Sequence, residues 1–284
     1  MPTVAVVSTG AMGSALAHAL VRGGVRVVAT ITGRSERTAG LAERAGAELL
    51  ADIAAVVREA DVVLSVVPPK HAEAVVRDIV RAARAQSSSP LLVELNAIAP
   101  STVLRIEAAA IQSGIEVVDG SISGPPPWKP GTRVYLSGPR AEDVAALPFE
   151  RVVRIVVGDE VGAASAVKMS TASVYKGSSA LLLQALRAAD ANGVIEHVLE
   201  DLRTATPELV ENVELRLASA VTKSGRYVGE MHEIAATQAA AGLTLALFEA
   251  MAEIYEGLAE TPFGNSSPED LPPDLTLPQI LESL

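Results

Sequence analysis

The chain has 284 residues, 49% hydrophobic and 20% charged, which is an ordinary globular composition with room for two domains. Its formal net charge of −11 argues against nucleic-acid binding, which usually needs a basic face. The lack of cysteine excludes disulfides, thiol nucleophiles and thiolate metal sites. The N-terminus lacks the pattern of a signal peptide, and no apolar run approaches the roughly 20 residues that span a bilayer, so we expect a cytoplasmic protein without a membrane segment.

The first part of the chain alternates short β-branched runs with alanine-rich helical stretches. This alternation predicts an α/β fold, a doubly wound Rossmann sheet with helices on both faces, over residues 1–157. The last two runs extend the sheet beyond the core fold. The expected strands are Val4–Val7, Val25–Thr32, Val62–Val67, Leu91–Leu95, Val117–Val118, Arg133–Ser137 and Val152–Val157.

The second part of the chain has a helical pattern. Asp159 is a candidate N-cap for a helix that begins near Glu160 and continues for about 33 residues without a proline. Such a helix is about 50 Å long, so we expect it to cross between domains or into a partner subunit. Residues 158–260 are interpreted as an all-α domain for substrate binding and dimerisation, and the proline-rich tail 261–284 as a loop. Shorter helices are expected near 194–204, 207–222, 227–241 and 243–260.

A glycine-bearing turn follows the first expected strand. The segment from Ser8 to Gly13 matches the dinucleotide pattern G-x-G-x-x-G, with Ser8 in place of the first glycine. Gly10 lets the backbone approach a pyrophosphate, and Gly13 lets helix and strand pack closely. The free N–H groups of the helix start, at Ala11 and Met12, favour phosphate. A strand-to-helix turn that binds no ligand can have the same pattern. The position of Ser8–Gly13 directly after the first strand, however, favours dinucleotide binding.

The end of the second strand selects the cofactor. An NAD enzyme usually places Asp or Glu there to bind the ribose 2′-hydroxyl, and no acid occupies residues 30–35. Arg34, Ser35 and Arg37 are instead suited to a 2′-phosphate, which the planar fork of arginine binds well. The sequence therefore favours NADP(H), although two solvated surface arginines would give the same pattern.

Four stretches carry a family resemblance that extends to about residue 260: Gly10–Gly13, Leu64–Pro69, Asp119–Gly124 and Gly162–Lys168. They resemble the β-hydroxyacid dehydrogenase and 6-phosphogluconate dehydrogenase superfamily, which also contains the imine reductases. Within it, Tyr175–Gly177 and Gly225–Ile234 resemble motifs of a poorly characterised branch. The resemblance implies an intertwined homodimer, in which helices of one subunit close the active site of the other.

The resemblance also implies a catalytic lysine. Reduction of a carbonyl needs a proton donor, and Lys168 matches the lysine that serves this role in β-hydroxyacid dehydrogenases. The family places an asparagine four residues later, where this chain has Ala172, which weakens the hydroxyacid assignment. Lys176 is the second candidate, because it falls where 6-phosphogluconate dehydrogenase has a substrate-binding tyrosine. Lys168 could also be an ordinary surface residue on a long helix.

Further residues are candidates for the substrate and the nicotinamide. Ser123 and Gly124 match the family loop that holds a substrate carboxylate, and Trp128 either lines the pocket or covers the sheet edge. Val67, Pro68 and Asn96 follow strands at the carboxyl edge of the sheet, so they are expected near the nicotinamide, unless Asn96 caps the helix that starts near Pro100. The family likeness brings His232 to the cleft, although packing at a solvent-exposed face explains it as well. Nothing in the sequence requires a metal.

The leading hypothesis is an NADP(H)-dependent oxidoreductase that interconverts a carbonyl and an alcohol on a small, anionic substrate. An imine reductase is the alternative within the superfamily: the missing asparagine favours it, whereas the retained Lys168 opposes it. A non-catalytic NADP-binding regulator is the alternative from a different class, since Ser8 and Ala172 both depart from the family pattern.

Overall fold

The computed structural model describes residues 1–266, 272 and 274–284. Its contacts divide the chain into two compact units, Met1–Met169 and Ser170–Leu284. The division falls inside the long helix α7 (Ala163–Ala191), rather than in front of it, because the first turns of α7 belong to the sheet-containing unit. Part of the predicted proline-rich tail, including Pro268 and Pro273, lies outside the described residues.

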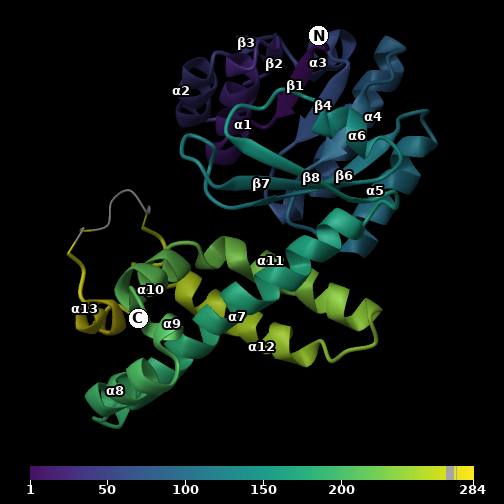
Figure 1. Ribbon diagram of the computed structural model, residues 1–284. Coiled ribbons are helices and arrows are strands. Elements are labelled where there is room, and N and C mark those ends of the chain that lie inside the picture. The colour runs from purple at the N-terminus through teal and green to yellow at the C-terminus, as the bar shows by residue number, and fades with distance from the viewer. Residues whose placement is uncertain (267–271, 273) are drawn as a thin grey trace. The chain divides into compact units, whose positions relative to one another are not determined.

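The first unit contains an eight-stranded sheet in the order β3-β2-β1-β4-β5-β6-β7-β8 (Figure 1). Strands β1 to β6 are parallel to one another, β7 is antiparallel to β6, and β8 is parallel to β7. The expected Rossmann sheet with two added strands is therefore confirmed. The strands are β1 (Val4–Val7), β2 (Val27–Ala29), β3 (Glu48–Leu49), β4 (Val62–Ser65), β5 (Leu91–Glu94), β6 (Val117–Ser123), β7 (Thr132–Ser137) and β8 (Val152–Gly158).

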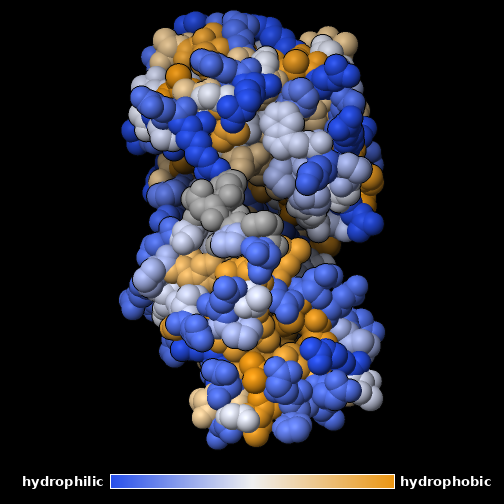
Figure 2. Space-filling model, turned by 90° about the vertical axis from the view of Figure 1, so that its left-hand side faces the viewer, coloured by the Kyte–Doolittle hydropathy of each residue, from blue (hydrophilic) through white to orange (hydrophobic). Residues whose placement is uncertain are grey.

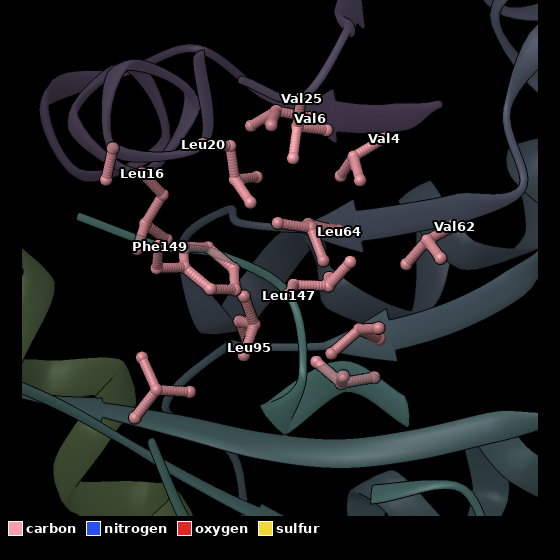
Figure 3. Close-up of a cluster of buried hydrophobic side chains, with 14 of the residues drawn as sticks. Val4, Val6, Leu16, Leu20, Val25, Val62, Leu64, Leu95, Leu147 and Phe149 are labelled. Carbon is pink, nitrogen blue, oxygen red and sulfur yellow. The ribbon is translucent and has the colours of Figure 1, made fainter. Parts of the chain in front are cut away.

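Helices cover both faces of this sheet. Successive residues of β1 show the two-sided burial: Val4 and Val6 belong to one hydrophobic cluster, and Ala5 and Val7 to another. Figure 3 shows the first cluster, in which the labelled side chains of α1 and the strands meet around Leu64. The helices are α1 (Ala11–Arg22), α2 (Glu36–Ala45), α3 (Ile53–Glu59), α4 (Ala72–Gln86), α5 (Pro100–Ile111) and α6 (Ala141–Ala145), with a short 3₁₀ helix η1 (Pro69–His71).

Three strands differ clearly from the sequence prediction. Strand β2 covers only Val27–Ala29 of the expected Val25–Thr32. Strand β3 was not expected, because it has only two residues, Glu48 and Leu49, at the edge of the sheet. Strand β6 continues beyond Val118 to Ser123, through polar residues that pair with β7. Polar groups inside a buried strand hide it from a prediction based on hydrophobic runs, and the structure satisfies them through side-chain hydrogen bonds.

The second unit is helical, as expected, and α11 and α12 make the most extensive helix contact in it. None of the described helices is long and apolar enough to cross a membrane. Fully buried side chains such as Leu186, Ile234 and Tyr255 form its interior. Its helices are the C-terminal part of α7, α8 (Ile195–Ala205), α9 (Pro207–Val210), α10 (Val213–Val221), α11 (Ser224–Ala240), α12 (Ala246–Ala259) and α13 (Leu277–Glu282).

Three helix predictions need correction. The long helix begins at Ala163 instead of near Glu160, so Asp159 does not cap it at the expected place. The helix expected over 207–222 is interrupted at Asn212, which adopts a left-handed conformation with φ 51°. The tail contains a helix, α13, which starts with a capping box between Thr276 and Gln279 and tolerates Pro278 in its first turn.

Candidate functional site

The turn between β1 and α1 leaves the start of helix α1 without a side-chain cap. Helix α1 begins after Gly10 without a side-chain cap and without an acid in its first turn, so its first N–H groups have no partner within the helix. A Cβ on Gly13 would overlap the carbonyl oxygen of Ser8, whereas one on Gly10 would meet no atom within 4 Å. The hydroxyl of Thr9 is buried and has no hydrogen-bond partner among the described residues. A dinucleotide pyrophosphate fits this turn in three respects. The helix start is uncapped, helix and strand pack closely, and the Thr9 hydroxyl has no partner among the described residues.

The loop after β2 carries the predicted 2′-phosphate residues. The backbone N–H of Arg34 donates to the carbonyl of Ile31 at 2.9 Å, which closes a turn with Gly33 at φ 72°. Ser35 caps α2, since its hydroxyl accepts the N–H of Thr38 at 3.3 Å. Arg34 and Arg37 are exposed, and Arg34 forms no ion pair in the part of the chain that is described.

Asn96 joins the loops after β4 and β5. Its Oδ1 accepts the backbone N–H of Val67 at 2.6 Å, and its Nδ2 donates to the hydroxyl of Ser65 at 3.1 Å. The proposed capping role of Asn96 is wrong, because the N-cap of α5 is Ala99. Asn96 instead fixes the backbone of Val67, directly before Pro68, at the carboxyl edge where ligands of doubly wound sheets bind.

Glu94 is a buried residue that the sequence analysis did not single out. It ends β5, in register with Ser65 of β4 and Asp119 of β6, and its side chain is completely shielded from solvent. Its Oε1 accepts the N–H of Asn96 at 2.9 Å, and its Oε2 has no partner among the described residues. Burial, and to a smaller extent the neighbouring Asp119, raise the pKa of Glu94 to about 8. Glu94 is therefore mostly uncharged at neutral pH.

Asp119 connects two of the family motifs. Its Oδ2 accepts the backbone N–H groups of Gly162 and Ser165 at 3.0 and 2.9 Å, and its Oδ1 accepts the hydroxyl of Ser165 at 2.6 Å. The hydroxyl of Ser137 also donates to Oδ2, at 3.1 Å. Burial raises the pKa of Asp119, while these hydrogen bonds oppose the rise. The carboxyl group from β6 thus caps the start of α7, which is the role that sequence analysis gave to Asp159.

Lys168 lies one turn further along α7. Its Nζ donates to the carbonyl oxygen of Ile122 at 2.7 Å, and the side chain is partly buried. Ile122 directly precedes Ser123, so the predicted catalytic lysine and the predicted substrate loop meet at the end of β6. Gly124 has φ 97°, and a Cβ there would overlap the carbonyl oxygen of Gly131, so the loop needs glycine at this position.

Trp128 contacts helix α1. Its ring packs against the ring of His18, with centroids 4.6 Å apart, and 38% of the residue is exposed. Its two expected roles, lining a substrate pocket or covering the sheet edge, both stay predictions. Among the described residues there is also no group of three or more metal-ligating side chains.

The remaining candidates belong to the second unit. Lys176 is 4% exposed, forms an ion pair with the equally buried Glu230, and lies over the ring of Tyr227 at 4.7 Å. Lys176 is therefore held inside the helical unit. His232 is exposed on α11, and Ala172 is completely buried in α7.

The parallel sheet and the uncapped first turn define the first unit as a nicotinamide-dinucleotide-binding domain of an oxidoreductase. Residues 3–147 match the family model described as the NAD binding domain of 6-phosphogluconate dehydrogenase, and residues 189–258 match a domain of unknown function. The chain belongs to the 6-phosphogluconate dehydrogenase-like superfamily, as its motifs indicated, and to the NAD(P)-dependent oxidoreductases within it.

Individual proteins agree with this assignment. A conserved protein of unknown function, described as structurally similar to 3-hydroxyacid dehydrogenases, is 30% identical, with a TM-score of 0.68 over 91% of this chain and 97% of its own. An uncharacterised 28.5 kDa protein of Methanothermus fervidus is 28% identical over 74% of this chain and 80% of its own length. The 3-hydroxyisobutyrate dehydrogenase of Mycobacterium tuberculosis is 21% identical and shares the fold, with a TM-score of 0.72 over 91% of this chain and 94% of its own.

Proposed function

We propose that this protein is an NADP(H)-dependent oxidoreductase that interconverts a carbonyl and an alcohol on a small, anionic, hydroxyacid-like substrate. The observation that carries the proposal is the 2.7 Å hydrogen bond from Lys168 Nζ to the carbonyl of Ile122, which holds the lysine beside the Ser123–Gly124 loop. An ammonium group beside a loop with a hydroxyl group can bind an anionic carbonyl compound and protonate it.

Each residue of the site would have one role in the reaction. The turn Gly10–Gly13 and the loop with Arg34 would hold NADPH, which would supply the hydride for the carbonyl carbon. Lys168 gives a proton to the carbonyl oxygen, so that one ammonium N–H bond breaks as the alcohol O–H bond forms. The hydroxyl and N–H groups of Ser123 and Gly124 hold the substrate carboxylate. Asn96 keeps Val67 and Pro68 in place at the carboxyl edge of the sheet through its bond to the Val67 N–H.

The preference for NADP(H) rests on the loop after β2. The absence of an acid at the end of β2 removes the usual partner of a ribose 2′-hydroxyl, and the exposed Arg34, Ser35 and Arg37 supply donors for a 2′-phosphate. The lack of an ion pair at Arg34 within the described residues leaves its guanidinium available for that phosphate.

A homodimer with intertwined helical domains is supported by the surface of the second unit. Figure 2 shows hydrophobic residues at the surface of this unit. Large apolar side chains there are exposed by more than half, which is typical of surfaces that a partner covers. They include Val174, Leu181, Leu215, Leu243 and Leu247.

A spectrophotometric screen of NADPH oxidation tests the proposed reaction. Keto acids, aldehydes and cyclic imines are compared side by side at equal concentration. Turnover of carbonyl compounds alone supports the proposal. Turnover of imines alone would identify an imine reductase, the alternative that Ala172 favours, because the hydrogen bond of the family asparagine to a hydroxyacid is missing. Tight NADPH binding without any turnover would indicate a non-catalytic regulator.

A further inference from the structure

The helical unit contains a pocket of its own, about 340 Å³ in volume. Its walls include Tyr175, Lys176 and Ser179 of α7, Arg216 and Ser219 of α10, and Tyr227 of α11. All of these residues belong to the unit Ser170–Leu284. Of the cations in the wall, Lys176 is already paired with Glu230.

Arg216 lies in the wall of this pocket without a carboxylate partner. Its Nε donates to Ser179 Oγ at 3.1 Å, its Nη2 to Ser178 Oγ at 2.5 Å, and its Nη1 to the carbonyl of Leu209 at 3.0 Å. These acceptors are all neutral. A guanidinium has five N–H bonds, so two remain for another acceptor, and Arg216 forms no ion pair within the described residues.

A second cation lies beside the pocket wall, in contact with Ser219. Lys223, in the turn before α11, donates to Ser219 Oγ at 2.6 Å and forms no ion pair in the described part of the chain. Its pKa is lowered by burial and by Arg226 nearby. The carboxylate of Glu230 does not serve Lys223, because it is paired with Lys176 and with Arg226, whose Nε lies 3.1 Å away.

A half-buried cation without a counter-charge loses part of its hydration, which lowers the stability of the folded protein. Such cations therefore favour the binding of an anion that pairs with them. We propose that this pocket binds a small oxyanion, a phosphate or a carboxylate, through the fork of Arg216 and the ammonium of Lys223. The planar arrangement of the two remaining Arg216 N–H groups matches two oxygens of such an anion. The chain as a whole carries a net charge of −11, so this local excess of positive charge is not a general property of its surface.

Titration calorimetry of the full chain with inorganic phosphate tests the proposal. Saturating NADPH is present, so that phosphate does not report on the cofactor site. We expect saturable binding with a Kd on the order of 1 mM, weakened at least tenfold by Lys223→Gln and by Arg216→Lys, which keeps the charge but loses the fork. Arg187→Gln removes one positive charge from an exposed site on α7 and should leave the affinity unchanged.

The result also distinguishes the two kinds of oxyanion. Acetate and succinate compete with phosphate if the pocket takes carboxylates, and they leave phosphate binding unchanged if it prefers phosphate. The proposal is overturned if none of these anions binds saturably, or if Arg187→Gln weakens binding as much as Lys223→Gln does. Circular dichroism of each variant shows that a lost affinity does not come from unfolding. The experiment needs no turnover, so its outcome is independent of the proposed reaction.

Discussion

Asp119 accepts both the backbone N–H and the hydroxyl of Ser165, at 2.9 and 2.6 Å, and so fastens the first turn of α7 to the end of β6. Lys168 follows Ser165 by three residues, which is nearly one helical turn. The hydrogen bond of Lys168 to Ile122 returns to the same strand. The position of the proposed catalytic lysine therefore depends on a buried polar network that involves no catalytic group.

This network makes the Ser165 hydroxyl important for stability. Ser165→Ala leaves Asp119 Oδ1 buried without its closest donor, so the free energy of unfolding should fall by about 1.5–3 kcal/mol. Urea unfolding measures the difference. Ser173→Ala is the control on the same helix, because that hydroxyl bonds only to the carbonyl of Ser170. Equal losses in the two variants would contradict the role given to Asp119.

Glu94 should make stability depend on pH. Its pKa is raised from about 4.5 in the unfolded chain to about 8 in the folded protein, so the folded state holds more protons between these values and stability falls as the pH rises through this window. Glu94→Gln removes this dependence. Its melting temperature should equal that of the wild type near pH 4 and exceed it increasingly up to about pH 8, with each kcal/mol worth about 2–4 °C.

Glu43→Gln is the matched control for Glu94, because Glu43 is an exposed glutamate on α2. It should follow the wild-type melting curve at every pH. A Glu94→Gln melting temperature that stays parallel to the wild type from about pH 4 to about pH 8 would mean that Glu94 is ionised in the folded protein.

The proposed cofactor preference depends on Arg34. Arg34→Gln should raise the KM for NADPH by roughly 10–100-fold and leave the KM for NADH nearly unchanged, because only the 2′-phosphate bond, worth about 1.5–3 kcal/mol, is lost. Initial rates with each cofactor provide the measurement. Arg44→Gln, at an exposed position in the last turn of α2, should change neither constant. An equal rise in the KM values for NADPH and NADH would show that Arg34 does not bind the 2′-phosphate.

Lys176 should contribute to stability more than to catalysis. Lys176→Met breaks a buried ion pair and should lower the free energy of unfolding by about 3–5 kcal/mol. Adding Glu230→Met should recover part of the loss, because the buried carboxylate is removed as well. A double-mutant cycle in urea gives the coupling energy. If Lys176→Met instead stays fully stable and loses turnover, Lys176 takes the catalytic role.

Much of the fold could be predicted from the sequence because hydrophobic periodicity and glycine turns are local. Strands β1, β4 and β5 start where their β-branched runs start, and one long helix follows β8. The start of α7 could not be predicted, because its cap comes from Asp119, more than 40 residues earlier in the chain. The raised pKa of Glu94 could not be predicted either, because it depends on burial between two neighbouring strands.

The candidate site was predictable only in part. Motif matching identified Lys168 and the Ser123 loop, and the 2.7 Å contact to Ile122 joins them. The hydrogen bonds of Asn96 to Val67 and Ser65 join side chain and backbone groups that meet only after folding. The same is true of the side chains around the Arg216 pocket. A lone glutamate in the apolar run Leu91–Leu95 was the one local signal for Glu94.

The turnover of Lys168→Ala tests the central claim most directly. Single-turnover rates with the best carbonyl substrate and NADPH should fall by about 10²–10⁴-fold, because the general acid is lost. The affinity for NADPH, measured separately by fluorescence titration, should stay within about twofold, because the Lys168 ammonium group is not part of the proposed dinucleotide contacts. An unchanged rate with intact NADPH affinity would contradict the account and remove Lys168 from the reaction.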